Sequence, residues 1–268
     1  CHNRRAGYNM NLTLFGVPNI PMVEPGDNLL GLIDAGLSSI NESLQVDDVI
    51  LLAQKIVSKA EDRYVDLNTV SPSANARSLA LEVDKDPRKV QVILNESNEV
   101  VRKRPGVLIV EQNLGFVQAN AGIDQSNINV EGVDGDDLLL LLPIDPDASA
   151  ARLRRAVSAK YGIDVGVIIN DSVGRAWRMG TVGLAIGVSG FTALEDYIGG
   201  TDLYGRELLV TQVAAADELA AAASLIMGQT TEKTPVVIAR GYCPVEPEDA
   251  DLQGVQPLLR PKQLDMFR

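Results

Sequence analysis

Residues 165–190 read VGVIINDSVGRAWRMGTVGLAIGVSG and place an apolar run on either side of a short polar and basic segment. The first run, 165–170, is short and rich in β-branched residues, which favours a buried strand that ends just before Asp171. The second run, 181–190, is apolar but rich in glycine, which indicates a strand with a kink or a closely approaching neighbour. This stretch therefore predicts sheet structure around the segment GRAWRMG.

Outward from this stretch, the chain mixes strand-like and helix-like patterns without strict alternation, and several strands adjoin in hairpin fashion. This mixture predicts an α+β fold with mixed or mostly antiparallel sheets and packed helices. The other expected strands cover 11–17, 49–53, 106–110, 115–119, 138–142, 207–214 and 235–240. The expected helices cover 27–40, 71–83, 86–101, 147–161 and 215–228.

Several helix ends are predicted from capping chemistry. Asp27 and Asp147 stand where a side chain could cap the first turn of a helix. Ser71 and Asp86 each precede a proline, and proline is favoured at the first helical position. Gly162 is the expected stop of the fourth helix.

The bulk composition sets the class of protein. The chain has 268 residues, of which 46% are apolar, so a sizeable core can form. We expect a disordered tail at 1–10, a main domain at 11–245 that could divide into two subdomains, and a C-terminal extension at 246–268. The sequence has no run of about 18 apolar residues, so we expect no membrane span, and no signal sequence is apparent. Only two cysteines occur, which fits a reducing cytoplasm.

The charge and the histidine count exclude several kinds of chemistry. A net charge of −12 makes non-specific binding to nucleic acid or anionic membranes unfavourable. His2 is the only histidine, so Ser-His-Asp, Cys-His and histidine-rich zinc sites are excluded. A metal would then be bound through oxygen, which suits magnesium, manganese or calcium.

Three segments end apolar elements in small polar groups: 120–127, 170–172 and 228–231. Taken singly, they are also explained as a turn, a turn or helix cap, and a solvated loop. Together they offer two carboxylates, a hydroxyl and an amide, a set that suits a magnesium-like ion with substrate phosphates if the loops converge. The four residues are Asp124, Asp171, Ser172 and Gln229.

Two basic segments could bind phosphates or carboxylates. Lys59 follows the buried strand 49–53, although a surface lysine is the simpler interpretation. Arg175 and Arg178 flank Trp177, and arginine clamps carboxylates and phosphates in a bidentate manner. The alternative is a solvated loop that Trp177 anchors into the core. No P-loop motif and no Gly-rich dinucleotide motif opens a helix.

Several motifs resemble one known family in their order along the chain. They are IPMVEPGDNL (20–29), SKAE (58–61), NAGIDQSN (120–127), PIDPDASAARLRR (143–155), the opening stretch 165–190, and DLYGRELLVTQVAAADELAAAASLIMGQ (202–229). Over residues 12–245 the chain looks like the coenzyme F-420-0:L-glutamate ligase family, including its archaeal ligases and the N-terminal ligase domain of its bacterial bifunctional relatives.

The resemblance implies a GTP-dependent amide ligase that adds L-glutamate, and further γ-linked glutamates, to the carboxylate of the deazaflavin precursor. An acyl phosphate would form, and GDP and phosphate would leave. It also implies two Mg²⁺ or Mn²⁺ ions, K⁺, a family-specific fold and an intertwined homodimer. The alternatives are a ligase for a different carboxylate acceptor, a non-catalytic GTP- and metal-binding protein, and a metal-dependent phosphohydrolase.

The resemblance also implies roles for individual residues. Asp124 and Asp171 would hold one ion, Ser172 and Gln229 would help to hold the second, and Lys59 would act in catalysis beside the two carboxylates. Gln54 and Lys55 stand where archaeal members have Ser-Thr, which leaves the choice of GTP over ATP open. The residues expected to border the nucleotide are Ile20, Pro21, Met22, Val23, Gln54, Lys55, Lys59, Asn127, Met227, Gly228, Gln229, Thr230, Thr231, Glu232, Lys233 and Thr234.

Overall fold

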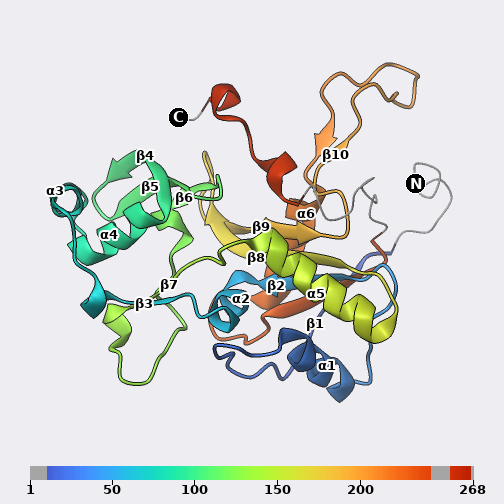
Figure 1. Ribbon diagram of the computed structural model, residues 1–268. Coiled ribbons are helices and arrows are strands. Elements are labelled where there is room, and N and C mark those ends of the chain that lie inside the picture. The colour runs from blue at the N-terminus through green and yellow to red at the C-terminus, as the bar shows by residue number, and fades with distance from the viewer. Residues whose placement is uncertain (1–10, 243–253, 267–268) are drawn as a thin grey trace.

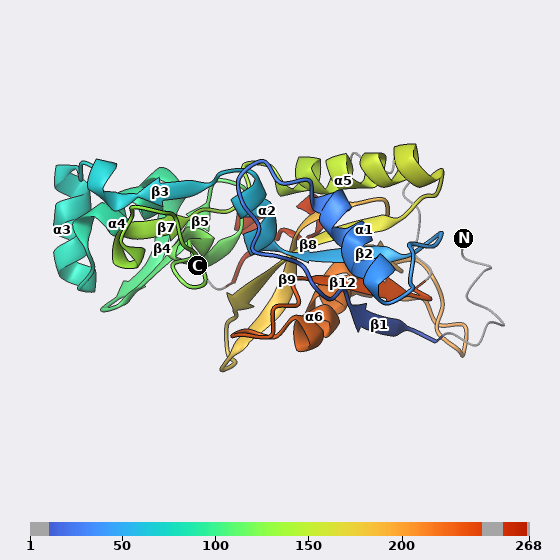
Figure 2. The ribbon, with the colours of Figure 1, turned by 90° about the horizontal axis from the view of Figure 1, so that it is seen from below.

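The computed structural model describes residues 11–242 and 254–266. The expected tail at 1–10, the domain boundary at 245, His2 and both cysteines lie outside these residues. Figures 1 and 2 show an elongated molecule with a larger lobe around the longest sheet and a smaller lobe that holds α3, α4, β4 and β5.

The larger lobe is organised by a five-stranded sheet in the order β1-β12-β2-β8-β9. Its strands are β1 (Thr13–Gly16), β12 (Val236–Arg240), β2 (Val49–Ala53), β8 (Gly166–Gly174) and β9 (Thr181–Ser189). The pair β2 and β8 is parallel, whereas the other neighbours are antiparallel. The expected α+β class with mostly antiparallel sheets is therefore confirmed.

Helices cover both faces of this sheet because its central strands are apolar on both sides. Along β2, Ile50 and Leu52 pack in one core cluster, and Val49 and Leu51 pack in another. The first cluster includes residues of α1 (Leu29–Ser39) and α5 (Pro146–Tyr161). The second includes residues of α6 (Ala215–Met227). Figure 2 shows α1 and α5 on one side of the sheet and α6 on the other.

The smaller lobe has its own sheet and core. The sheet joins β4 (Ser97–Arg104), β5 (Val107–Gln112) and β6 (Val117–Ala119) in that order, and it is antiparallel. Helices α3 (Ala74–Val83) and α4 (Pro87–Asn95) contribute buried side chains to the same cluster as β5.

The remaining elements are short, and some of them connect the two lobes. The antiparallel pair β3 (Tyr64–Asp66) and β7 (Leu138–Leu140) joins them, and α2 (Gln54–Ala60) follows β2 directly. A two-stranded pair, β10 (Glu195–Asp196) and β11 (Gln212–Val213), starts a projecting arm that Figure 1 shows beside α6. Among the described residues no helix has the length and apolar character that a membrane span needs.

Two element predictions are wrong in part. The helix expected at 86–101 ends at Asn95, and Ser97–Arg104 forms β4 because β5 offers it a hydrogen-bonding partner. The strand expected at 207–214 is reduced to Gln212–Val213. Its apolar residues Leu209 and Val210 are 71% and 85% exposed, so no core selects an extended pairing there.

Three helix caps also differ from prediction. Asn28 caps α1 in place of Asp27, Ser73 caps α3 in place of Ser71, and Asp145 caps α5 in place of Asp147. The Asp147 carboxylate instead accepts backbone N–H groups from β9 and from the C-terminal segment. The cap at Asp86 and the left-handed stop at Gly162 are confirmed.

Candidate functional site

The three polar segments meet at one cavity of about 490 Å³. It lies at the carboxyl end of the parallel pairing between β2 and β8. The last pair of this ladder, Ala53 and Asn170, lines the cavity. Side chains that leave neighbouring parallel strands at this end converge on one edge of the sheet, which is where open sheets commonly bind ligands.

Every residue that the resemblance assigned to metal or nucleotide lines this cavity. The lining also includes residues to which the sequence gave no role: Ala53, Ile56, Ser126, Asn170, Ser224 and Pro235. For Asn170 the available signal was an amide at the end of an apolar run. For Ser224 it was a hydroxyl within an alanine-rich helix.

Asp171 and Ser172 lie inside β8 rather than beyond its end, which corrects the expected turn or cap. Successive strand residues point to opposite faces, so Asp171 points away from the face shared by Asn170 and Ser172. A register shift between Ile169 and Asn170 marks a β-bulge at this point. Bulges next to functional sites re-aim side chains, and this one directly precedes both candidate ligands.

On one face of β8 the Ser172 hydroxyl donates a 2.8 Å hydrogen bond to Oε1 of Gln229. On the same face the Asn170 amide donates to Oγ of Ser224 at 2.9 Å. The end of α6 and the loop that follows it are therefore tied to β8 through two polar contacts. A cation bound between the Ser172 and Gln229 oxygens would be coordinated there by uncharged ligands only.

On the other face Asp171 lies near Asp124. Burial, and then the charge of Asp124, raise the pKa of Asp171 to about 7, against the lowering effect of a 2.8 Å hydrogen bond from the Ser172 N–H. Burial also raises the pKa of Asp124, although Lys55 opposes this. Two carboxylates that burial destabilises in this way favour a bound cation.

The donor set fits a hard divalent ion. Within residues 11–242 and 254–266, no group of three or more Asp, Glu, His or Cys side chains is arranged to hold a metal. An ion here would therefore depend on two carboxylates, a hydroxyl, an amide and oxygens of a substrate, as magnesium commonly does.

Helix α2 brings two lysines to the same cavity. Lys55 and Lys59 are four residues apart and so share a helix face. Nζ of Lys55 lies 3.2 Å from Oδ1 of Asp124, and Nζ of Lys59 donates to the backbone carbonyl of Asn127 at 2.8 Å. Burial, followed by the charge of Lys55, lowers the pKa of Lys59. Both lysines therefore bind the segment that carries Asp124.

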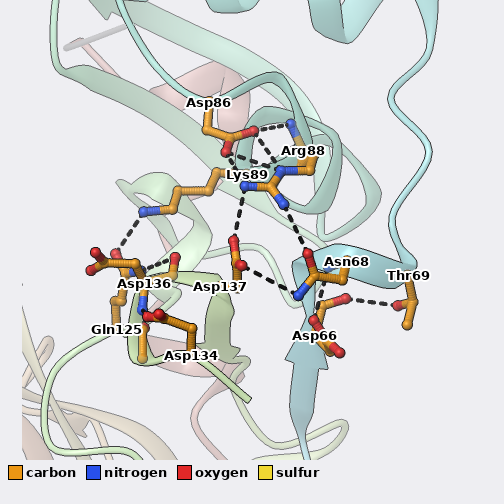
Figure 3. A network of polar contacts seen from close by, with 11 residues as sticks. Asp66, Asn68, Thr69, Asp86, Arg88, Lys89, Gln125, Asp134, Asp136 and Asp137 are labelled. Atoms are coloured by element: carbon orange, nitrogen blue, oxygen red, sulfur yellow. Dashed lines mark hydrogen bonds and ion pairs between the residues drawn. The ribbon is translucent and has the colours of Figure 1, made fainter. Parts of the chain in front are cut away.

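Residues of the smaller lobe contact the same segment at Gln125, as Figure 3 shows. Lys89 donates to Oε1 of Gln125 at 2.7 Å, and Nε2 of Gln125 donates to the carbonyl of Asp136 at 2.7 Å. Arg88, next to Lys89, pairs with both Asp86 and Asp137. Asp124 itself exchanges two 2.9 Å backbone hydrogen bonds with Leu140.

The loop after α6 closes the remaining side. Gly228 has a φ of +70°, a conformation that glycine adopts without strain and that turns the chain out of the helix. The Thr230 N–H donates to the Glu232 carboxylate at 2.8 Å, and the Asn127 amide donates to the Thr230 carbonyl at 3.2 Å. The segments around Asp124 and Gln229 are thereby linked directly.

The arginine-rich loop lies apart from this cavity. Residues 175–180 form the tip of the β8–β9 hairpin, and neither Arg175 nor Arg178 lines the site. Trp177 is 85% exposed, so the alternative in which it anchors a solvated loop into the core is wrong in that respect. Arg175 donates to the Gly180 carbonyl and closes the tip.

Comparison with known proteins gives a consistent picture. The profile of the F420-0:Gamma-glutamyl ligase family matches residues 18–241. The Coenzyme F420:L-glutamate ligase of Methanothermobacter thermautotrophicus is 46% identical over 259 residues, which cover 97% of this chain and 100% of that protein. The proteins of the same name from Methanopyrus kandleri and Archaeoglobus fulgidus are 44% and 42% identical, over 94% and 87% of this chain and 96% and 88% of their own lengths.

Proposed function

The chain belongs to the F420-0:gamma-glutamyl ligase family, and from this premise we propose that it joins L-glutamate to the terminal carboxylate of the deazaflavin coenzyme F420-0 with GTP as the energy source. Further γ-linked additions would repeat the reaction on the newly added glutamate. The observation that carries this proposal is the meeting of Asp124, Asp171, Ser172 and Gln229 at one cavity. A phosphate-rich substrate that binds with cations requires such a set.

The reaction has to overcome an unreactive carboxylate. Transfer of the γ-phosphoryl group of GTP to a carboxylate oxygen breaks the bond to the β-phosphate, releases GDP and forms an acyl phosphate. The amine of glutamate then attacks the acyl carbon and forms the amide bond. The single bond from this carbon to the bridging oxygen breaks, and inorganic phosphate leaves with that oxygen and the electron pair. The proton that the amine loses passes to solvent or to the departing phosphate.

Asp124 and Asp171 would hold one Mg²⁺ or Mn²⁺ ion, and Ser172 and Gln229 would help to hold a second. Bound there, the ions would supply positive charge against the β- and γ-phosphate oxygens. Two separate positions are supported because Asp171 and Ser172 point to opposite faces of β8 while both line the one cavity. The expected K⁺ stays a prediction without assigned ligands.

Lys59 would offset negative charge that develops as the phosphoryl group moves. Only 6% of its surface is exposed, and a cation in such an enclosed place acts more strongly than one in water. The Gln54 amide donates to Ser58 within the same helix at 2.7 Å. Gln54 is buried, so of the two residues that replace Ser-Thr, Lys55 would reach the nucleotide, and residues 20–23 and 227–234 would border it.

We extend the proposal to the intertwined homodimer that the resemblance implies. The arm between β10 and β11 projects from the larger lobe (Figure 1) and exposes apolar side chains that a second copy of the chain would cover. These are Ile198, Leu203, Tyr204, Leu209 and Val210. Replacement of Leu209 and Val210 by serine would convert a dimer into a monomer in light-scattering measurements, and a wild-type protein that is monomeric at micromolar concentration would contradict the dimer.

One assay separates the proposed activity from its alternatives. GDP and glutamylated product are measured with GTP and Mg²⁺, with and without the deazaflavin acceptor and L-glutamate. The proposal requires that both products depend on both co-substrates. Release of phosphate without the amine would indicate a phosphohydrolase, and product with another carboxylate only would indicate a different acceptor.

Two variants connect the activity to the cavity. Asp171→Asn removes a candidate ion ligand and is expected to reduce turnover by about 100-fold or more. The matched control is Asp47→Asn, since Asp47 is exposed and has a φ of +64°, which asparagine adopts readily. Wild-type turnover in Asp171→Asn at saturating Mg²⁺ would remove this cavity from the mechanism.

A further inference from the structure

We propose that Lys55 is a built-in counter-cation of the ion site: it holds the Asp124 carboxylate when no divalent ion is bound and releases that carboxylate when an ion arrives. The inference rests on the proposed function in one respect, since it takes Asp124 as an ion ligand. It assigns Lys55 a role in the order of binding, beyond a contact with the nucleotide.

The position of Lys55 resembles that of a coordinated cation. Its Nζ lies 3.2 Å from Oδ1 of Asp124, 3.1 Å from the carbonyl of Ser126 and 3.2 Å from the Ser126 hydroxyl. An ammonium group has three donors and no acceptor, so these three oxygens satisfy it completely. Oδ1 of Asp124, a residue that lines the cavity, is thus already engaged by a positive charge.

Exposure distinguishes the two lysines of α2. The Lys55 side chain is 24% exposed and lies in the first turn of the helix, whereas Lys59 is 6% exposed. Lys55 has a flexible four-carbon stem and a path into the cavity, while Lys59 is enclosed and bound to the Asn127 carbonyl. Lys55 is therefore the cation that can move.

Positive charge at this place favours the ionised form of both carboxylates. Asp124 and Asp171 repel each other, and Lys55 acts on both carboxylates in the direction that favours their charged forms. A divalent ion between the carboxylates would take over that role and compete with the ammonium for Oδ1 of Asp124. The released ammonium would then find nucleotide phosphates within the same cavity.

A purely structural ion pair is the competing explanation, and the other contacts of the loop speak against it. The segment 124–127 is fixed without Lys55 by the backbone pair of Asp124 with Leu140, by Lys89 on Gln125 and by Lys59 on Asn127. These three contacts hold both ends of the segment in the absence of Lys55. Lys55 adds two hydrogen bonds to Ser126 and a positive charge at the carboxylate.

The test measures Mn²⁺ binding to the nucleotide-free protein at pH 7.5 by the electron paramagnetic resonance signal of free Mn²⁺. Lys55→Met removes the competing ammonium and is expected to bind Mn²⁺ roughly fivefold more tightly than wild type. Lys55→Gln should show the same gain. Lys103→Met is the matched control, because it removes the same charge from an ion pair with Glu82 in the smaller lobe that does not involve segment 124–127, and its Mn²⁺ affinity should equal that of wild type.

The outcomes separate this inference from the proposed function. Unchanged or weaker Mn²⁺ binding in both Lys55 variants, or an equal gain in Lys103→Met, would overturn the role of Lys55 while the ion site stands. Absence of Mn²⁺ binding to wild type, with and without GTP, would overturn the ion site and the inference with it. Circular dichroism on each variant establishes that the binding data come from folded protein.

Discussion

The Ser172 hydroxyl donates a 2.8 Å hydrogen bond to the side-chain oxygen of Gln229, across 57 positions of sequence. Ser172 is fixed by the β8 ladder, and Gln229 lies two residues beyond the end of α6. This contact brings a hydroxyl and an amide oxygen together beside the cavity. The strand β8 and the segment after α6 therefore both contribute ligands to one candidate ion site.

Removal of this hydroxyl should weaken ion binding in a way that a conservative change does not. Ser172→Ala is expected to raise the Mn²⁺ concentration needed for half-maximal turnover by about 10- to 100-fold. Ser172→Thr keeps the hydroxyl and should remain within about threefold of wild type. Titration of the ligase rate with Mn²⁺ gives both values, and equal behaviour of the two variants would show that the hydroxyl holds no ion.

A second prediction concerns Asn170, whose Oδ1 is buried and has no hydrogen-bond partner among the described residues. Such an atom costs about 1–3 kcal/mol. Asn170→Leu removes this cost but also the contact to Ser224, so its thermal midpoint should stay within about 4 °C of wild type. The loss of this hydrogen bond between β8 and α6 should still raise KM for the proposed substrate GTP by about tenfold.

A loss of stability alone would not produce this pattern. Asn170→Ala serves as the comparison, because it leaves a cavity and should lower both the thermal midpoint and the affinity for GTP. If Asn170→Leu has the KM of wild type, the amide does not position the loop that carries Gln229.

The third prediction uses the close packing of β9 on α6. A Cβ added at Gly183 would lie 2.1 Å from Oγ of Ser224 and 2.5 Å from the Ala220 carbonyl. Gly183→Ala should therefore destabilise the fold by about 1–3 kcal/mol. Gly174 pairs with the start of β9 and has open space at its Cβ position, so Gly174→Ala is the matched control.

Urea unfolding of the two alanine variants measures this difference. Equal midpoints for Gly183→Ala and Gly174→Ala would mean that the helix moves away from the strand at little cost. In that case, the small residues of α6 would not determine the distance between the two elements.

The sequence predicted those parts of the fold that depend on local pattern. The glycine-rich run 181–190 indicated a strand with a close neighbour, and Gly183 under α6 has that role. The apolar run 165–170 indicated a buried strand, but the strand extends to Gly174 because β9 continues to pair with it. The polar residues Asp171 and Ser172 gave no local sign that a ladder would include them.

Contacts between distant segments could not be predicted from the local sequence pattern. Ser71 and Ser73 are equally good caps by type, and the residue that caps α3 is Ser73, whose own N–H donates to Gln91 of α4. Likewise, the oxygen donors of the site were visible as residue types, whereas the pairing of Lys55 with Asp124 depends on how α2 meets the loop from the smaller lobe. The sequence therefore supplied the candidate groups, and the tertiary fold supplied their distances.

The last prediction concerns the pH dependence of stability at the start of α4, in the network of Figure 3. Asp86 caps this helix and pairs with the Arg88 guanidinium at 2.7 Å, and hydrogen bonds from the Arg88 side chain lower the pKa of Asp86. A carboxyl with a lower pKa in the folded state binds fewer protons there than in the unfolded chain. Its contribution is therefore complete above the unfolded pKa of about 3.9 and is lost as the pH falls through the folded value.

Two substitutions separate the charge from the cap. Asp86→Asn keeps a good capping residue but loses the charge, so its thermal midpoint should be about 2–4 °C below wild type at pH 7, and the gap should close as the pH falls to about 3. Asp86→Ala also loses the cap, so a gap of about 2–4 °C should persist at low pH. A gap for Asp86→Asn that does not change between pH 7 and pH 3 would show that the carboxylate charge does not stabilise this end of the smaller lobe.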